Sequence, residues 1–410
     1  MDRRLLALLS FSVIALGLVV LVTRLLGSDS GPSSAVLTSD PAVDELPVIE
    51  PLTSADAAGK PTPTPPDGFE LAFDFPDETD ELIPEPQQGP PAPPPPEAVY
   101  TGVLGSLGPN EQIVAPAADP PPAVAAGVSP LTGTASASAG AQALVAKIDN
   151  AEAGRPQAGI ADADVVVEEM VEGGITRLAA IFQTSGQALG PIRSARTTDI
   201  AILVSLNRPL LAWSGANSLT ASLVLAQPIV DRGLSTGAAY VRSTGRPAPH
   251  NLMTDVASIR AGATGTTPPT QFAFRSPEDE LLGTETAGFA VDFPAVSVGW
   301  QWDGQAWART QNGSAHVDAA GVQVRAENVI VQVVRYGGTG MADTSGAAVK
   351  EALSVGTGRA WIYTQGRVIR ANWTKPSLAA VTTFTDGAGN HIPLTPGRTW
   401  IELAPPSAVG

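Results

Sequence analysis

Two arginines, Arg193 and Arg196, stand three residues apart in the segment GPIRSARTTDI, residues 190–200. A guanidinium group presents several N–H donors in a planar fork that matches the oxygen atoms of a phosphate or a carboxylate. The threonines and the aspartate that follow are typical of the start of a helix, where free backbone N–H groups also attract anions. The segment therefore predicts an anion-binding site with both arginines on one face of a helical turn.

Carboxylates offer a second kind of chemistry. Glu168, Glu169 and Glu172 end one apolar run, and Asp149 and Asn150 end another. In a strand that continues through residue 172, Glu168 and Glu172 share one face and Glu169 lies on the other. Such carboxylates can act as a general acid/base pair or hold a divalent cation. No metal-binding motif of fixed spacing accompanies them, so we assign no metal ligands.

A third candidate is the histidine in GRPAPHNL, where His250 and Asn251 follow a proline-rich turn. A loop histidine of this kind is either a general base or a hydrogen-bonded part of the loop, and both interpretations stay open. His316, in SAHVDAAG, is interpreted as part of a polar strand end. The segment GLSTG matches the G-x-S-x-G motif at Ser235, but no acidic residue separates Ser235 from His250, as that motif's triad order requires.

A structural interpretation competes with the anion site. Arginine outnumbers lysine 17 to 3 between residues 141 and 410, so arginine is the ordinary cation of this segment. In that case Arg177, which begins the next apolar run, and Arg196 neutralise Glu168 or Glu172.

The elements that must position these residues alternate between strands and helices. Apolar, β-branched runs predict strands, and helical spacing after a polar N-cap predicts helices. The predicted strands span residues 143–150, 163–171, 176–183 and 209–215, and the predicted helices span residues 197–207 and 217–226. This order predicts an α/β sandwich with a mixed sheet, whose ligands bind beyond the carboxyl ends of strands.

The pattern changes after residue 277. Short alternating runs at residues 296–313, 328–336, 358–375 and 382–403 are joined by Asp-Gly, Asn-Gly and Gln-Gly turns. Such runs predict strands and hairpins. We therefore predict an α/β domain over residues 141–277 and a β-rich domain over residues 278–410.

A membrane anchor is predicted over residues 1–27. Leu5 to Thr23 carries no charge over 19 residues, which is about 28 Å of helix and close to the hydrocarbon thickness of a bilayer. Arg3 and Arg4 precede it, and the positive-inside rule leaves the N-terminus in the cytoplasm and the folded domains outside. A cleaved signal peptide remains the alternative.

Residues 28–140 are predicted to be a disordered linker. They hold 17 acidic residues, one basic residue and 23 of the 38 prolines, a composition that disfavours a packed core. Because the net charge of the whole chain is −16, this segment accounts for the acidity and the folded part is nearly neutral.

Composition also excludes several classes of function. The chain has no cysteine and three histidines, which excludes thiolate chemistry, zinc–thiolate sites and disulfides. No basic run is present of the kind that nucleic-acid binding requires.

Several segments resemble the YerB-like family of bacterial extracytoplasmic proteins. They are IDNAEAGRPQAGIADADVVVEEMVEGGITRLAAIFQ, GPIRSART and APHNL, followed by GSAHVDAAGVQVRAENVIVQ and IPLTPGRTWIEL. The resemblance implies a two-domain protein tethered outside the membrane, usually as a lipoprotein, with no assigned reaction. The positions that match the motifs are Asp149, Asn150, Arg155, Glu168, Glu172, Gly173, Gly174, Arg177, Arg193, Arg196, His250 and Asn251. An apolar helix takes the place of the lipidated cysteine here.

Three hypotheses follow. The first is a membrane-tethered binding or accessory protein of the cell envelope that holds an anionic ligand, either a phosphorylated or uronic-acid glycan or a lipid-linked precursor. Its ligand-binding residues are Asp149, Asn150, Arg177, Arg193, Arg196 and Asn251. The second is an envelope hydrolase or transferase that uses Glu168, Glu172 or His250 as acid or base. The third is a protein-interaction scaffold. The expected partner is an envelope component or an envelope protein, and the cofactor is left open.

Overall fold

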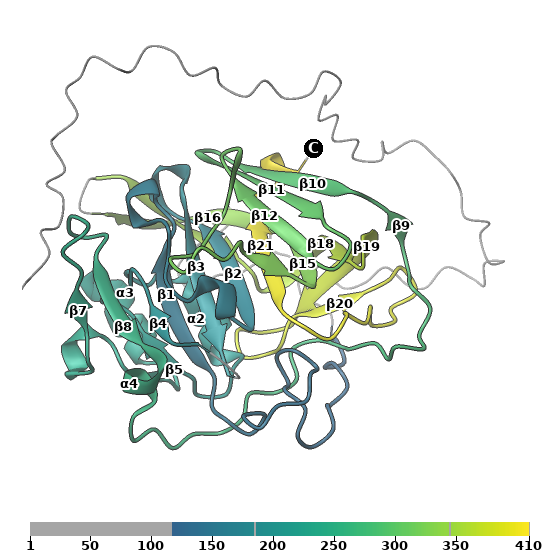
Figure 1. The fold of residues 1–410 in the computed structure, drawn as a ribbon, viewed down its shortest axis with the longest axis horizontal. Coiled ribbons are helices and arrows are strands. Elements are labelled where there is room, and N and C mark those ends of the chain that lie inside the picture. Colours follow the sequence, from purple (N-terminus) through teal and green to yellow (C-terminus); the bar gives the residue numbers. More distant parts are fainter. Residues whose placement is uncertain (1–116, 184–185, 344–345, 410) are drawn as a thin grey trace, which may run out of the picture. The chain divides into compact units, whose positions relative to one another are not determined.

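The computed structural model describes residues 117–183, 186–343 and 346–409, and Figure 1 shows their fold. An eleven-stranded mixed sheet, with strand order β20-β19-β18-β15-β21-β2-β3-β1-β5-β6 and β9 against β19, dominates this part of the chain. Its strands are β1 (Leu144–Asp149), β2 (Val165–Met170), β3 (Thr176–Phe182), β5 (Leu210–Ala212), β6 (Val230–Asp231), β9 (Thr284–Glu285), β15 (Asn328–Val333), β18 (Gly356–Thr364), β19 (Arg367–Lys375), β20 (Thr383–Thr385) and β21 (Thr399–Ala404).

Three smaller sheets and a few short helices complete the described fold. A second sheet contains β10 (Gly288–Phe293), β11 (Val296–Trp302), β12 (Trp307–Gln311), β13 (Ser314–Ala315) and β14 (Arg325–Ala326). A hairpin joins β16 (Arg335–Ala342) to β17 (Ala348–Leu353), and β4 (Ala188–Leu189), β8 (Leu252–Asp255) and β7 (Val241–Arg242) pair separately. The α-helices are α2 (Thr198–Val204), α3 (Ser218–Leu225) and α4 (Val256–Arg260), and single 3₁₀ turns lie at residues 152–154, 160–162, 172–174, 234–236 and 406–408.

The predicted strands and helices are confirmed as elements, and the fold is a sheet-rich mixed α/β structure with few helices. The boundary predicted near residue 277 lies in the connection between α4 and β9. Strands from both sides of it nevertheless belong to one sheet, because β21 runs parallel to β2 on one side and to β15 on the other. The last strand of the chain therefore joins the two predicted domains through backbone hydrogen bonds.

Both faces of the central strands are covered, which explains their continuous apolar runs. Every residue of β1, β2 and β3 is buried. One face packs against the second sheet, where Phe289, Val298 and Trp307 lie. The opposite face packs against Ile200 and Leu203 of α2.

The fold begins earlier than predicted. The disordered linker was expected to reach residue 140, but Leu131 is fully buried and the hydroxyl of Ser129 donates a 2.7 Å hydrogen bond to Gln183. The small residues after Leu131 form a tight turn, closed by a bridge between Val128 and Ala135. Small residues are common in tight turns as well as in disordered linkers, so composition alone placed the linker boundary too late.

The predicted anchor over residues 5–23 and the rest of the linker up to residue 116 lie outside the described residues. Within the described part, no helix is long and apolar enough to cross a membrane.

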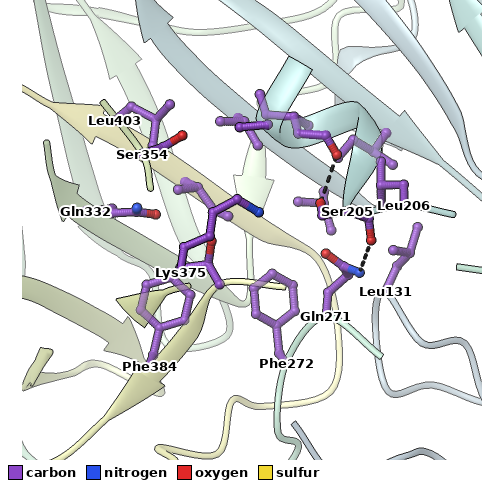
Figure 2. A pocket seen from close by; sticks show the side chains of 17 residues that line it. Leu131, Ser205, Leu206, Gln271, Phe272, Gln332, Ser354, Lys375, Phe384 and Leu403 are labelled. Atoms are coloured by element: carbon purple, nitrogen blue, oxygen red, sulfur yellow. Dashed lines mark hydrogen bonds between the residues drawn. The ribbon is translucent and has the colours of Figure 1, made fainter. Parts of the chain in front are cut away.

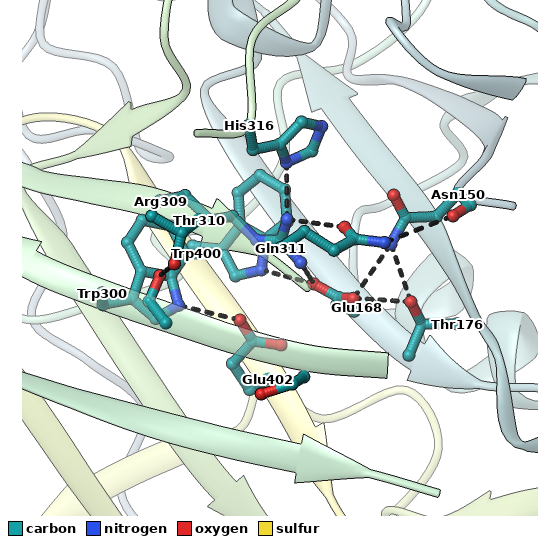
Figure 3. A network of polar contacts seen from close by, with 12 residues as sticks. Asn150, Glu168, Thr176, Trp300, Arg309, Thr310, Gln311, His316, Trp400 and Glu402 are labelled. Carbon is teal, nitrogen blue, oxygen red and sulfur yellow. Dashed lines mark hydrogen bonds and ion pairs between the residues drawn. The ribbon is translucent and has the colours of Figure 1, made fainter. Parts of the chain in front are cut away.

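A buried polar network connects the two large sheets (Figure 3). At its centre, Nη2 of Arg309 in β12 donates to Oε2 of Glu168 in β2 over 2.7 Å, and both side chains are fully buried. The same carboxylate accepts hydrogen bonds from Thr176 (2.6 Å), Asn150 (3.1 Å) and the indole of Trp400 (3.2 Å). The two oxygens of Glu168 together accept from four donors, so this buried carboxyl group is fully hydrogen-bonded.

His316 completes the coordination of Arg309. Nη1 of Arg309 donates to Nδ1 of His316 over 2.5 Å, and Nε2 of His316 lies 2.8 Å from Oε1 of Gln157. Burial, then the positive charges of Arg309 and Arg155, hold the pKa of His316 well below its usual value. The imidazole is therefore neutral and accepts from the arginine. His316 follows β13 directly, at a polar strand end as expected, and only 2% of it is exposed because it packs against Arg309.

A second carboxyl group lies beside Glu168. Glu402 of β21 is its register partner across the parallel pair and is fully buried. Burial and the neighbouring charge of Glu168 raise the pKa of Glu402 well above its usual value. Oε1 of Glu402 accepts a hydrogen bond from the indole of Trp300 over 3.0 Å.

Replacing Arg309 by methionine tests this network. The change leaves the Glu168 carboxylate buried without its cation, and we expect a loss of about 3–5 kcal/mol in the free energy of unfolding. Urea unfolding of the full-length chain, followed by tryptophan fluorescence, measures it.

Arg325→Met is the matched control, because Arg325 in the neighbouring strand β14 pairs with Asp303 over 2.8 Å but is 43% exposed. An exposed pair contributes less than about 1 kcal/mol. Equal losses in the two variants would contradict a central role for the Arg309–Glu168 pair.

Candidate functional site

The candidate site lies beyond the carboxyl ends of the parallel strands β1 and β5, which pair as far as Ala146 and Ala212. Past these residues, the segment 192–195 inserts between the two strands. The backbone N–H of Arg193 donates to Lys147 (2.8 Å) on the β1 side, and its carbonyl accepts from Ser214 (3.0 Å) on the β5 side. The region beyond the carboxyl ends of parallel strands is where α/β sheets place ligands.

The shared helical turn predicted for Arg193 and Arg196 is absent. The segment is extended and α2 begins only at Thr198. Hydrogen bonds to β1 and β5 hold the backbone straight, and Ile192 and Ala195 point into the core. The two arginines therefore have different partners.

Arg193 lies beside Asp149 and His250. Nδ1 of His250 is 2.6 Å from Oδ2 of Asp149, and Nε of Arg193 is 3.7 Å from the same oxygen. The Asp149 side chain is 4% exposed, whereas His250 and Arg193 are 22% and 19% exposed. The carboxylate is thus buried behind two cationic or ionisable groups that face the surface. Nε2 of His250 has no partner among the described residues.

The surrounding loops are fixed by close contacts. A side chain at Gly154 would meet the carboxyl group of Asp149 at 2.7 Å, so only glycine fits there. Arg246 donates to the carbonyl oxygens of Gly154 and Pro156. Asn251 donates to the carbonyl oxygens of Ser243 and Arg246, which shapes the loop that carries His250. Asn251 is therefore a loop-holding residue in this geometry.

Arg196 forms a bidentate ion pair with Glu172. Nε and Nη2 of Arg196 lie 2.7 and 2.6 Å from the two carboxylate oxygens. Burial alone would raise the pKa of Glu172, but the hydrogen bonds and charge of Arg196 outweigh it and lower this pKa. The structural interpretation is confirmed for this pair. The strand β2 ends at Met170 and does not continue through Glu172, because Gly173 and Gly174 turn the chain with φ of 74° and 73°.

Arg177 lies behind these groups with 5% exposure and donates to the carbonyl oxygen of Ser194 over 2.9 Å. Burial, then the charges of Arg196 and Arg193, lowers the pKa of Arg177 to about 10. It remains a cation and adds positive potential to the crevice. Arg177 was also expected to neutralise Glu168, but the cation on Glu168 is Arg309.

The predicted residues separate onto two faces of the sheet. One face, near the ends of β1 and β3, carries six of them: Asp149, Glu172, Arg177, Arg193, Arg196 and His250. The other face carries Asn150 and Glu168, which belong to the buried network. Glu169 is opposite Glu168, as expected, and it binds Lys147 over 2.8 Å. Lys147 also pairs with Asp199 over 2.7 Å. This buried triad fastens α2 to the sheet.

Several polar residues escaped the sequence reasoning. Lys147, Asp199, Arg309 and Lys375 are each at most 3% exposed. The alternation of β12 contained a signal, since Trp307, Arg309 and Gln311 stand two residues apart and share a buried face. The same rule places Lys375 with Ala371 and Trp373 on the buried face of β19.

Among the described residues, no group of three or more His, Asp or Glu side chains gathers that could hold a metal ion. The cofactor stays open.

Comparison with known proteins shows which family this chain belongs to. Residues 131–269 match the model described as the N-terminal domain of a protein of unknown function, DUF3048, and residues 289–401 match its C-terminal domain. The chain belongs to the YerB-like DUF3048 family. It is 26% identical over 274 residues to the "Putative lipoprotein YerB" of Bacillus subtilis strain 168, which covers 63% of this chain and 80% of that protein.

The fold agrees with this family. The crystal structure of the YerB protein from Bacillus subtilis matches with a TM-score of 0.56 at 21% identity. The match covers 68% of this chain and 96% of that one. The YerB-like fold thus includes both segments that share the eleven-stranded sheet.

A double-mutant cycle on Glu172→Ala and Arg196→Ala measures the bidentate pair of this YerB-like chain. We expect a coupling free energy of about 1–3 kcal/mol at pH 7, because the pair is charged and largely buried. The pKa of Glu172 is lower in the folded chain, so this stabilisation is present above its unfolded-state pKa near 4.5 and is lost as the pH falls through the folded-state pKa. Urea unfolding at pH 7 and at acid pH measures it.

The exposed pair Arg367–Glu285, in which Glu285 is 83% exposed, serves as the control cycle and should couple by less than about 1 kcal/mol. A coupling for Glu172 and Arg196 that matches the control, or that persists unchanged in acid, would refute the assignment.

Proposed function

We propose that this chain is a membrane-tethered extracytoplasmic accessory protein of the cell envelope that holds an anionic group at Arg193. The observation that carries the proposal is the cluster at the β1–β5 crevice, where Arg193 and His250 are partly exposed in front of buried Asp149. Arg193 keeps N–H donors for a ligand because it meets its carboxylate through one 3.7 Å contact.

The two other arginines have supporting roles in this proposal. Arg196 is engaged by Glu172 and positions the segment that carries Arg193. Arg177 is buried and contributes positive charge. A phosphate or a uronic-acid carboxylate at Arg193 would therefore lie in the positive potential of three guanidinium groups. The carboxylates of Asp149 and Glu172 neutralise this potential only in part.

The tether and the location rest on separate support. The relative is named a lipoprotein, and this chain has no cysteine to carry a lipid. We infer that the apolar segment 5–23 anchors it instead, with the N-terminus in the cytoplasm and the folded part outside.

Retention on acidic cell-wall polysaccharide tests the anion site. The full-length chain in mild detergent is passed over immobilised phosphate-bearing polymer, uronate-bearing polymer and a neutral glucan. Arg193→Gln removes the charge, and we expect it to weaken retention on the matching acidic polymer by about tenfold, or ~1.4 kcal/mol.

Arg325→Gln is the control, since Arg325 is a more exposed arginine on the second sheet, and its retention should equal that of the wild type. Equal retention of the wild type and Arg193→Gln on every polymer would contradict the proposal. Equal weakening by both variants would point to non-specific charge.

A second candidate function, an envelope hydrolase or transferase, is favoured by the 2.6 Å contact between Asp149 and His250. A carboxylate on Nδ1 orients an imidazole so that Nε2 can act as a general base. Glu168 and Glu172 have less scope for this role, because Arg309 and Arg196 hold their carboxylates.

Release of soluble fragments from purified cell walls tests this candidate. The wild type should release them, and His250→Ala should reduce the rate by roughly 10²–10⁴-fold through loss of the base. His391→Ala, at another partly exposed loop histidine, should match the wild type. Release by the wild type and His250→Ala at the same rate would exclude His250 as the base.

A further inference from the structure

A cavity of about 70 Å³ lies on the α2 side of the large sheet, away from the arginine crevice. Its walls come from β2, β3, β15, β19, β21, the end of α2 and residues 271–272. Most of the lining is apolar, including Val167, Phe272, Phe384 and Leu403. The cavity shares no lining residue with the candidate site.

Lys375 places an amine in this apolar space. Figure 2 shows its Nζ pointing between Gln332 and Ser354 on one side and Ser205 and Gln271 on the other. Lys375 is 3% exposed, and its Nζ donates to the carbonyl oxygen of Ala380. No carboxylate of the described chain lies within ion-pairing distance of it, and it is the one titratable residue among the 17 that line the cavity.

Two other polar side chains of the lining make no hydrogen bond. The side chains of Gln332 and Ser354, 3% and 9% exposed, make no hydrogen bond within the described part of the chain. Both side chains line the same cavity as Lys375 (Figure 2), so their N–H and O–H groups are available to a ligand there.

We propose that this cavity binds a small carboxylate with a short aliphatic tail, with the carboxylate on Nζ of Lys375 and the tail against the surrounding apolar side chains. The class follows from the lining. A single buried cation without a counter-ion calls for one anionic group, and flanking donors suit carboxylate oxygens. The apolar walls disfavour a second charged group on the ligand. The cavity volume equals that of about two water molecules in the liquid, which limits the ligand to a few heavy atoms.

The site makes a specific prediction for pH. Burial lowers the pKa of Lys375 to about 7. A bound carboxylate favours the charged amine, so binding takes up protons above pH 7 and tightens as the pH falls from 8.5 to 6. No other titratable group lines the cavity to mask this dependence.

Ligand-observed NMR on the full-length chain, with propionate, propanol and propylamine as probes of equal chain length, tests the proposal. We expect propionate to bind at least tenfold more tightly than propanol or propylamine at pH 6, and tenfold more tightly at pH 6 than at pH 8.5. Lys375→Met should remove the preference for propionate over propanol.

Lys375→Arg keeps the charge but does not titrate, so it should bind propionate with no change between pH 6 and 8.5. Thermal melts of each variant show whether it is folded, and the wild-type pH dependence stands without them. Binding of propionate no tighter than propanol at pH 6, or independent of pH in the wild type, would overturn the proposal.

Discussion

The carboxylate of Glu168 lies in the interior at the junction of the two large sheets, and Arg309 supplies the charge that makes this position tenable. An unpaired charge at such a depth costs several kcal/mol, so the contact of Arg309 with β2 stabilises the folded chain. The same contact orders His316, Trp400 and Glu402 around it. The second sheet is thereby fixed to the first by direction-dependent bonds as well as by apolar packing.

This junction also places the candidate site. The second sheet covers one face of the strands β2, β3 and β1, and β21 pairs with β2 within their sheet. Their opposite face then carries Asp149, Arg177 and the segment of Arg193 at one edge. Adjacent residues of one strand serve the two purposes, since Glu168 points to the junction and Glu169 to the Lys147 triad. The position of the cationic crevice therefore depends on the buried network behind it.

Local sequence patterns predicted most of the strands and helices but few of the hydrogen bonds and ion pairs between them. The apolar runs of β1, β2 and β3 and the start of α2 at Thr198 follow from periodicity, although the threonine before the helix makes no capping hydrogen bond. The positions of Asp149 at a strand end and of His250 in a loop were also predicted, whereas their contact with each other is tertiary. By contrast, Arg309 is 141 residues from Glu168 in sequence, and no local rule connects them. Arg193 was misplaced on a helical turn because its hydrogen bonds to both neighbouring strands are tertiary.

Native-state hydrogen exchange on the full-length chain and its Arg309→Met variant tests most directly whether the Glu168–Arg309 pair unites the two segments. If it does, the most protected amides of β2, β21 and β12 open with one common free energy, and the variant lowers all of them by the same amount. Separate opening would contradict this account, with β12 amides exchanging freely in the variant while β2 and β21 amides keep their wild-type protection.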